Sequence, residues 1–390
     1  MNNVLAPKGL RSVIAIIGDT NSGKSLLVNK LVGQEVSIVS DIKGTTTDAV
    51  VKGYELIGLG AISIYDTAGF NDDSELGNKR VRATKKVIYK SDLVLVVIGK
   101  DGISQELSLE IKELEQKSIP YIKVYNFMDE IEYRNVEDGI MVSAKTGENV
   151  EKLKDEIIKK LKNTLVETPL ISDKISKGDL VLLVTPIDEA APRGRLIMPQ
   201  VQTIRDILDG DGVVLVTKED ELESCLNRLK EKPKFVVTDS QAVKNVAKMI
   251  DDSIKFTTFS TLFARYKGDF KVLYEGANKL DCLKDGDKIL IAEGCAHRVT
   301  CNDIGRVRIP NMIKQYTKKE LEFDIVSGAD FKDNLEDYAL VVHCGGCMLN
   351  RMEVIRRIHE CSRAKVSITN YGMLISKTQG VFDRVVKDLI

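Results

Sequence analysis

The first part of the chain, up to about residue 165, alternates short runs of apolar, often β-branched residues with longer amphipathic stretches. The short runs predict buried strands at residues 13–17, 61–65, 93–98 and 121–124. The amphipathic stretches predict helices at residues 25–32, 79–89, 105–117 and 149–165. Strands that alternate with helices predict a mostly parallel sheet with helices on both faces.

The rest of the chain continues this α/β pattern in two smaller units. The segment Glu167-Thr168-Pro169 ends the first unit, because proline cannot continue a helix. In the second unit we expect strands at 179–185, 212–216 and 234–238, and helices at 200–208, 219–229, 240–250 and 258–267. In the third we expect strands at 288–292 and 339–343, and a helix at 352–364. The pattern therefore predicts an α/β chain of three domains, at residues 1–168, 169–268 and 269–390.

Length and charge narrow the classes of function. At roughly 150 residues per domain, 390 residues suit two or three domains. The 57 Lys and Arg residues balance 58 Asp and Glu residues, so no basic excess favours a nucleic-acid partner. The longest apolar runs are too short to span a bilayer, and the N-terminal apolar stretch has no cleavage site and leads into a phosphate-binding motif. We expect a cytoplasmic protein with neither a nucleic-acid nor a membrane partner.

Residues 18–25 read Gly-Asp-Thr-Asn-Ser-Gly-Lys-Ser and lie between a predicted strand and a predicted helix. This is the G-x-x-x-x-G-K-S pattern of a phosphate-binding loop (P-loop), in which glycines let backbone N–H groups surround the phosphates. Lys24 would reach the β- and γ-phosphates, and the Ser25 hydroxyl would ligate Mg²⁺. The alternative is a glycine loop with an incidental Lys-Ser pair.

Two further segments follow in the order that a nucleotide site requires. Asp66-Thr67-Ala68-Gly69 comes after a predicted strand, where Asp66 would hold Mg²⁺ through water and the Gly69 N–H would sense the γ-phosphate. Residues 44–48, Gly-Thr-Thr-Thr-Asp, form a hydroxyl-rich loop, from which we favour Thr46 as the metal-sensing hydroxyl. Taken alone, that loop could be an ordinary turn.

Over about residues 10–165 these motifs resemble the translation-factor-related small GTPases, particularly the tRNA-modification and ribosome-assembly branch. Ser143-Ala144-Lys145 matches the base-contacting loop of that family, and residues 126–129, Asn-Phe-Met-Asp, stand where it has Asn-Lys-x-Asp. Asp129 would accept from guanine N1–H and N2–H₂, and the ring of Phe127 could stack on the base in place of the lysine stem. An ordinary strand-end turn is the alternative for residues 126–129. The resemblance implies the following nucleotide-binding residues: Asp19, Thr20, Asn21, Ser22, Gly23, Lys24, Ser25, Thr46, Asp66, Gly69, Asn126, Asp129, Ser143, Ala144 and Lys145.

The resemblance also bears on the rate of hydrolysis. Phe70 stands where many signalling GTPases carry a water-orienting glutamine, so hydrolysis needs another source of charge stabilisation. In the potassium-activated members of the family a P-loop asparagine ligates K⁺, and Asn21 occupies that position. This implies slow, K⁺-dependent GTP hydrolysis, with Mg²⁺ held by Ser25 and Thr46. Its catalytic residues would be Lys24, Thr46, Asp66 and Gly69. A loop-stabilising role is the alternative for Asn21.

Cysteine and histidine residues gather in the third unit. Four of the seven cysteines and two of the three histidines fall between residues 295 and 347, and an odd number of cysteines argues against a disulfide scaffold. Cys295-Ala296-His297 and His343-Cys344-Gly345-Gly346-Cys347 each follow a predicted strand, so a parallel sheet would bring both to one edge. Three thiolates with one weaker position are the pattern of a 4Fe–4S cluster with an exchangeable site. Zinc, a redox C-x-x-C pair and buried structural cysteines are the alternatives.

The C-x-H…H-C-x-x-C arrangement, after a GTPase domain and a smaller α/β domain, resembles the FeFe-hydrogenase maturation GTPase family. Residues 186–192, 194–200 and 303–307 are also similar to that family, so the resemblance covers essentially the whole chain. It implies a scaffold or carrier that holds a 4Fe–4S cluster on Cys295, Cys344 and Cys347. Such a protein also bears a transient diiron subcluster, made with two radical-SAM maturases, and passes it to the apo FeFe-hydrogenase.

The same resemblance implies a homodimer formed by the middle domain, with GTP hydrolysis controlling partner release. His297 or His343 is the expected fourth cluster ligand, although either could instead orient a thiolate through a hydrogen bond. Cys301 and Asp303 are further candidates for that position. The rival hypothesis is a K⁺-type GTPase that acts on RNA or ribosome assembly and carries a structural zinc site.

Overall fold

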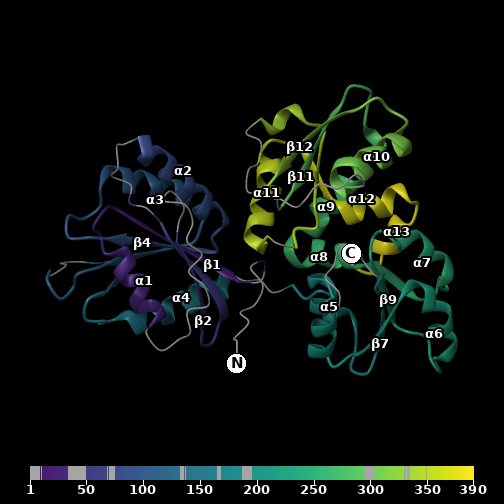
Figure 1. Ribbon diagram of the computed structural model, residues 1–390, viewed down its shortest axis with the longest axis horizontal. Coiled ribbons are helices and arrows are strands. Elements are labelled where there is room, and N and C mark those ends of the chain that lie inside the picture. The colour runs from purple at the N-terminus through teal and green to yellow at the C-terminus, as the bar shows by residue number, and fades with distance from the viewer. Residues whose placement is uncertain are drawn as a thin grey trace. The chain divides into compact units, whose positions relative to one another are not determined.

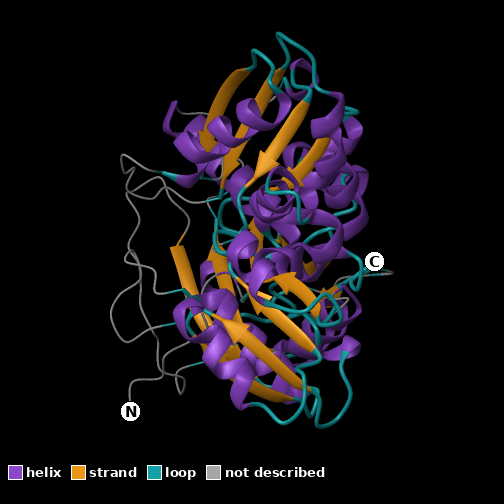
Figure 2. Ribbon diagram, turned by 90° about the vertical axis from the view of Figure 1, so that its right-hand side faces the viewer, coloured by secondary structure: helices purple, strands orange, loops and turns teal. Residues whose placement is uncertain are grey.

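The described residues of the chain fall into two compact units, Met1–Val166 and Glu167–Ile390. The computed structural model describes residues 9, 11–33, 50–67, 69, 75–131, 136, 138–164, 168–186, 196–294, 303–328, 331, 334–347 and 349–390. Three sheets make up these units, one in the first and two in the second (Figure 2).

The first unit is built on a six-stranded sheet in the order β2-β3-β1-β4-β5-β6. Its strands are β1 (Ser12–Gly18), β2 (Val50–Leu56), β3 (Gly60–Asp66), β4 (Leu93–Ile98), β5 (Tyr121–Tyr125) and β6 (Ile140–Met141). The strand β2 runs antiparallel to β3, whereas the other neighbouring pairs are parallel. Every side chain of β4 is buried, as expected for a central strand in a sheet that is covered on both faces.

Helices cover both faces of this first sheet. They are α1 (Lys24–Val32), α2 (Glu75–Lys90), α3 (Gln105–Gln116) and α4 (Val150–Thr164). Alternate side chains of β1 point to opposite faces, so Ile14 and Ile16 share a core with α1 and α4, while Ala15 and Ile17 share one with α2 and α3. Figure 1 shows the result, with α2 and α3 on one side of β1 and β4, and α1 and α4 on the other.

The second unit begins with a four-stranded parallel sheet in the order β10-β9-β7-β8. Its strands are β7 (Leu180–Val184), β8 (Val213–Thr217), β9 (Phe235–Thr238) and β10 (Lys255–Thr258). Its helices are α5 (Met198–Asp209), α6 (Leu222–Arg228), α7 (Val243–Met249) and α8 (Phe259–Lys267). Side chains of α5 and α8 pack on one face of the sheet and side chains of α6 and α7 on the other.

A second parallel sheet follows, in the order β12-β11-β13-β14. Its strands are β11 (Lys288–Glu293), β12 (Glu322–Ser327), β13 (Leu340–His343) and β14 (Ser367–Asn370). Its helices are α9 (Phe270–Asn278), α10 (Ile309–Thr317), α11 (Arg351–Arg363), α12 (Tyr371–Thr378) and α13 (Phe382–Val386), and a π-helical turn covers Ile304–Arg308. One apolar core joins the two sheets of this unit, since Val236 and Phe256 pack in the same cluster as Ile291 and Val342.

The predicted fold class is confirmed: a larger α/β sheet that carries the P-loop precedes two smaller α/β sheets. The predicted strands and helices match observed elements to within a few residues at each end. Five strands escaped prediction, namely β2, β6, β10, β12 and β14, and all five lie at sheet edges. Each of the five is short or interrupted by polar residues, so none shows the continuous apolar run that predicts a buried strand. Among the described residues, no helix combines the length and apolar character needed to cross a bilayer.

Candidate functional site

The loop between β1 and α1 has the close approach that a phosphate-binding loop requires. Gly23 has a φ of 86°, and a Cβ atom there would lie 2.2 Å from Nδ2 of Asn126. Only glycine fits this combination of left-handed backbone and tight contact. Asn21 is also left-handed, with a φ of 64°, and its side chain is exposed. Of the other predicted loop residues, Thr20 and Ser25 are exposed and Ser22 is buried.

The side chain of Lys24 folds back over its own loop. Its Nζ donates to the carbonyl oxygens of Gly18 at 3.0 Å and Asp19 at 2.7 Å, and only 8% of the residue is exposed. Burial lowers the pKa of Lys24, whereas the nearby carboxylates of Asp66 and Asp19 act in the opposite direction. The ammonium group is therefore held at the loop, where a phosphate could replace the carbonyl oxygens as acceptors.

The end of β3 meets this loop. Asp66 is the last residue of β3, and its Oδ1 atom is buried without a hydrogen-bond partner among the described residues. Gly69 lies against the P-loop, because a Cβ atom there would be 2.6 Å from Oγ1 of Thr20. An orphaned carboxylate oxygen beside a phosphate-binding loop fits a water-bridged Mg²⁺. Thr46 and Phe70 lie outside the described residues.

Asn126 joins two loops that are far apart in the sequence. Its Nδ2 donates to the carbonyl oxygen of Ser22 at 3.0 Å, and its Oδ1 accepts from the backbone N–H of Ala144 at 3.0 Å. A side chain that is 1% exposed thus fastens the P-loop to the loop that follows β6. A hydrogen bond from the Ser143 side chain lowers the pKa of Asp129, which keeps its carboxylate ionised.

Sequence reasoning missed one residue at the P-loop. The Oγ of Ser104 donates to Oδ1 of Asp19 at 2.7 Å while it accepts from the backbone N–H of Leu107, so it also caps α3. Serine followed by a helical pattern is a helix-start signal, but its contact with Asp19 spans 85 positions and is invisible in the sequence.

The cysteine motif of the third sheet lies where two parallel strands end. Ala292 of β11 is in register with His343 of β13, so the two strands end at the same edge of the sheet. The backbone N–H of Gly294 donates to Sγ of Cys344 at 3.0 Å. Cys295 is the next residue after Gly294, so the chain enters the Cys295 segment beside the Cys344 thiol. Cys295, His297 and Cys301 themselves lie outside the described residues.

The imidazole of His343 is buried, with both of its ring nitrogens engaged. Nδ1 lies 2.6 Å from the carbonyl oxygen of Cys344, and Nε2 lies 3.0 Å from Nη1 of Arg357. A carbonyl only accepts and a guanidinium only donates, so the proton is on Nδ1. Burial, together with the charge of Arg357, lowers the pKa of His343 to about 4.

Arg357, on α11, is a fully buried arginine that sequence reasoning did not single out. Besides His343, it donates to the carbonyl oxygen of Gly328 at 2.7 Å and pairs with Glu353 at 3.3 Å. Its guanidinium also lies 5.4 Å from the centroid of the Phe331 ring. In the sequence it stands within a short basic cluster that resembles a solvated helix face.

Lys267, the last residue of α8, is buried against the backbone of the Cys344–Cys347 loop. Its Nζ donates to the carbonyl oxygens of Leu349 at 2.7 Å, Gly346 at 3.1 Å and Cys347 at 3.4 Å. Only 2% of Lys267 is exposed, and burial lowers its pKa to about 8, while the cysteines Cys347 and Cys344 act in the opposite direction. This ammonium group holds the loop and places a positive charge beside it.

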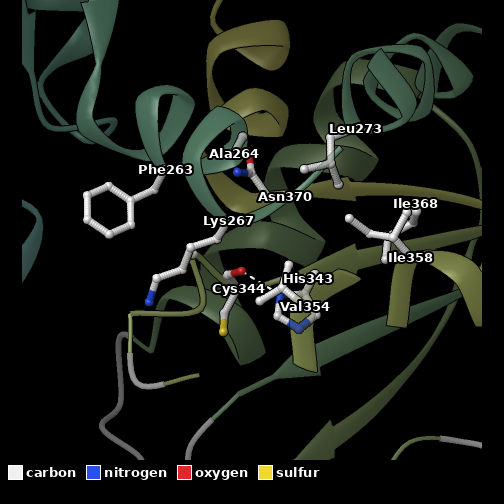
Figure 3. A pocket seen from close by; sticks show the side chains of 12 residues that line it. Phe263, Ala264, Lys267, Leu273, His343, Cys344, Val354, Ile358, Ile368 and Asn370 are labelled. Carbon is white, nitrogen blue, oxygen red and sulfur yellow. Dashed lines mark hydrogen bonds between the residues drawn. The ribbon is translucent and has the colours of Figure 1, made fainter. Parts of the chain in front are cut away.

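A small cavity of about 20 Å³ lies between α8 and the end of β13 (Figure 3). Apolar side chains form much of its wall, and the Cys344 side chain lines it as well. Figure 3 also shows the contact of His343 with the Cys344 carbonyl. A volume of this size suits about one water molecule, so the cavity is too small to be a substrate pocket.

Metal ligands do not assemble within the described part of the chain. There, no three His, Cys, Asp or Glu side chains come close enough together to hold an ion. None of the five described cysteines is in a disulfide. Asp303, the oxygen candidate, accepts a hydrogen bond from the backbone N–H of Arg306 at 3.0 Å and so caps the π-helical turn.

Three family models match most of the chain. Residues 13–127 match the family described as 50S ribosome-binding GTPase. Residues 170–268 match the hydrogen maturase F dimerization domain, and residues 271–388 match the hydrogen maturase F tetramerization domain. The chain belongs to the hydrogen maturase F family. The hydrogen maturase F domains thus contain both sheets of the second unit, with Lys267 in one domain and the Cys344–Cys347 loop in the other.

Curated relatives are similar to this chain over very different lengths. The tRNA modification GTPase MnmE of Thermosipho melanesiensis is 34% identical over 175 residues, 44% of this chain and 39% of that protein. MnmE of Legionella pneumophila is 36% identical over 156 residues, 39% of this chain and 34% of that protein. The matches thus span well under half of these relatives. The GTPase Der of Clostridium kluyveri is 22% identical over 380 residues, 92% of this chain and 82% of that protein.

Solved structures are similar to only part of this chain. The G domain of the T. maritima FeoB iron transporter is 22% identical with a TM-score of 0.31, covering 38% of this chain and 98% of its own. Era from Aquifex aeolicus, bound to GDP and AlF₄⁻, is 19% identical with a TM-score of 0.33, covering 53% of this chain and 93% of its own.

Proposed function

We propose that this protein is a GTP-hydrolysing scaffold that binds a 4Fe–4S cluster and assembles and delivers the diiron subcluster to the apo FeFe-hydrogenase. The observation that carries the proposal is the parallel pairing of β11 with β13, because it brings the Cys344 thiol beside Gly294, the residue before Cys295. Membership of the hydrogen maturase F family supports the same role. The expected partners are the radical-SAM hydrogenase maturases and the apo-hydrogenase, with no nucleic acid or membrane.

In this proposal Cys295, Cys344 and Cys347 hold the cluster. Two features of the loop suit the negative charge of bound thiolates. The Gly294 N–H already donates to the Cys344 sulfur, and the Lys267 ammonium lies at the carbonyl oxygens of the same loop. Three thiolates leave one iron without a cysteine, so the bound cluster supplies an exchangeable coordination position.

We propose that His343 positions the Cys344–Cys347 loop and is not the fourth ligand. Its Nδ1 is engaged with the Cys344 carbonyl and its Nε2 with Arg357, so binding iron would require one of these two buried hydrogen bonds to break. The fourth position then belongs to His297 or to an exchangeable ligand.

In the GTPase domain, Lys24 would neutralise the β- and γ-phosphates, and Ser25 and Thr46 would hold Mg²⁺. Asp66 would hold the metal through water, and Gly69 would contact the γ-phosphate. Asn21 is exposed at the P-loop, where its carbonyl oxygen is available to K⁺. We propose slow, K⁺-activated hydrolysis that controls partner release.

We further propose that the protein forms a homodimer through the β8 edge of the middle sheet. That edge exposes 50% of Val213 and 39% of Val216, and an exposed apolar strand edge favours pairing with a second copy.

The domain boundaries in this proposal are 1–168, 169–268 and 269–390. The five described cysteines are outside disulfides, which suits the reducing, cytoplasmic location that we propose. The rival role in RNA or ribosome assembly is not favoured, because hydrogen maturase F domains match most of the chain beyond the GTPase domain.

Anaerobic reconstitution with iron and sulfide tests the central claim. We expect about four irons per chain, a broad absorption band around 400 nm and an EPR signal after reduction. Ala substitutions at Cys295, Cys344 and Cys347, one at a time, should each abolish this signature. Cys282→Ala is the matched control because Cys282 is exposed and has no role in the proposal, and Lys24→Ala should also keep the cluster. Uptake of one zinc per chain with no iron would contradict the proposal.

A further inference from the structure

The guanine-binding motif of this chain has a phenylalanine where related GTPases have lysine, and the backbone is strained at that residue. Phe127 has a φ of 67°, a left-handed conformation that is unusual for an aromatic residue. Its carbonyl oxygen accepts from the backbone N–H groups of Glu130 at 2.9 Å and Ile131 at 3.0 Å, which holds the turn. The turn brings the ring to the P-loop, because its Cζ would lie 3.5 Å from a Cβ atom on Gly23. Strain of this kind concentrates at functional sites.

A lysine from a different loop reaches the same ring. Lys100 follows β4, and its Nζ lies 4.8 Å from the centroid of the Phe127 ring. Glu130 holds this ammonium group by an ion pair, and the Nζ of Lys145 lies 3.5 Å from the other oxygen of Glu130. Lys100 and Lys145 thus place two positive charges around one negative charge, beside the Asp129 carboxylate predicted to read guanine.

We propose that Lys100 and Phe127 divide between them the role of the missing motif lysine in binding the guanine nucleotide. A lysine at position 127 would supply an apolar stem that covers the base and a cationic tip near the nucleotide. Here the ring of Phe127 supplies the cover, and Lys100 supplies the positive charge and fixes the ring by a cation–π contact. Lys100 is a positioning and specificity residue. This inference rests on the proposed function of the first unit as a guanine-nucleotide site.

A purely structural role for Lys100 makes a different prediction. The Lys100 side chain is 47% exposed, and ion pairs at such exposure contribute little. If Lys100 only paired with Glu130, its loss would leave nucleotide affinity unchanged. The Lys117–Glu113 pair is a matched control, because the Lys117 side chain is 42% exposed, also pairs with a carboxylate, and belongs to none of the nucleotide motifs.

The test is the dissociation constant of GDP, measured by calorimetry on the full chain, with ADP as the competitor for specificity. We expect Lys100→Met to weaken GDP binding about fivefold, as loss of about 1 kcal/mol of cation–π and charge interaction requires. Lys117→Met should bind like the wild type. Phe127→Lys in the Lys100→Met background should restore wild-type affinity, since it rebuilds the lysine of the related motif.

Two results would overturn the inference: Lys100→Met binding GDP as tightly as Lys117→Met, or no rescue by Phe127→Lys when thermal unfolding shows the double variant to be folded. The experiment distinguishes failure of this inference from failure of the proposed function. If the wild type binds GDP and discriminates against ADP but the Lys100 variant is unaffected, this inference alone fails. If the wild type does not bind GDP, the nucleotide site itself is wrong.

Discussion

The Nη1 atom of Arg357 lies 3.0 Å from Nε2 of His343, and this contact determines which nitrogen of the imidazole carries the proton. Nε2 must accept, so Nδ1 donates to the carbonyl oxygen of Cys344 at 2.6 Å. The C-x-x-C loop is thereby joined to α11 through a neutral histidine.

Replacing Arg357 with Met should lower the free energy of unfolding by about 3 kcal/mol, because it leaves Glu353 as a buried charge and His343 Nε2 without its donor. Chemical denaturation of the apoprotein measures this change. Arg363→Met, on an exposed position of the same helix, should change stability by less than about 0.5 kcal/mol. Equal stabilities for the two variants would show that the buried network contributes nothing.

Replacing His343 with Asn should leave the iron content of the reconstituted protein near that of the wild type, since the imidazole is already engaged on both sides. Iron analysis and pulsed EPR on histidine labelled with ¹⁵N make the measurement. A strong nitrogen coupling that vanishes in the His343 variant would identify His343 as a ligand and contradict its positioning role.

Removal of the Lys267 ammonium by substitution with Met should destabilise the apoprotein by about 3 kcal/mol, because three buried carbonyl oxygens lose a charged donor. It should also lower the reduction potential of the bound cluster, since a nearby positive charge stabilises the more negative, reduced form. Thermal unfolding and a redox titration test the two effects. Lys271→Met, at an exposed position, is the control. An unchanged reduction potential would mean that the charge of Lys267 has no electrostatic effect on the cluster.

GTP hydrolysis should be faster in KCl than in NaCl at equal ionic strength, and Asn21→Ala should remove that difference. The reason is that the amide oxygen of Asn21, exposed at the P-loop, would ligate K⁺ beside the phosphates and offset the charge that develops there. Phosphate release in the two salts is the measurement. Equal wild-type rates in both salts would end the potassium hypothesis.

Charging the β8 edge should dissociate the homodimer. The double variant Val213→Glu, Val216→Glu would place four carboxylates at the paired edge of a dimer, two from each copy. Like charges oppose strand pairing. Sedimentation velocity should show a shift toward monomer in the double variant. Ile57→Glu changes a residue that is 91% exposed in the first unit and serves as the control. If the double variant stays dimeric, the dimer interface does not lie at the β8 edge. Association beyond the dimer would indicate a contact through the tetramerization domain.

Much of the fold was predictable because its signals are local. The buried run Leu93–Ile98 identified a central strand, and the glycine pattern of residues 18–25 identified the phosphate-binding loop between strand and helix. The sequence also predicted that the strands before the two cysteine groups end at one edge of a parallel sheet, whereas their direct pairing and register came from the structure. Edge strands such as β12, with exposed Glu322 and Asp324, escaped because their composition does not separate them from loops.

The sequence by itself determined the α/β architecture, the order of the nucleotide motifs and the pattern of cysteines. Each single element or motif can be recognised from residues within a few positions of one another. Only the tertiary structure decided that Arg357 fixes the tautomer of His343, that Lys267 holds a loop 79 positions further along the chain, and that Lys100 covers the ring of Phe127. The physical reason is that burial gives Arg357 and Lys267 their roles and contact between separate loops gives Lys100 its role, whereas a Lys or Arg in sequence is most often a solvated surface residue.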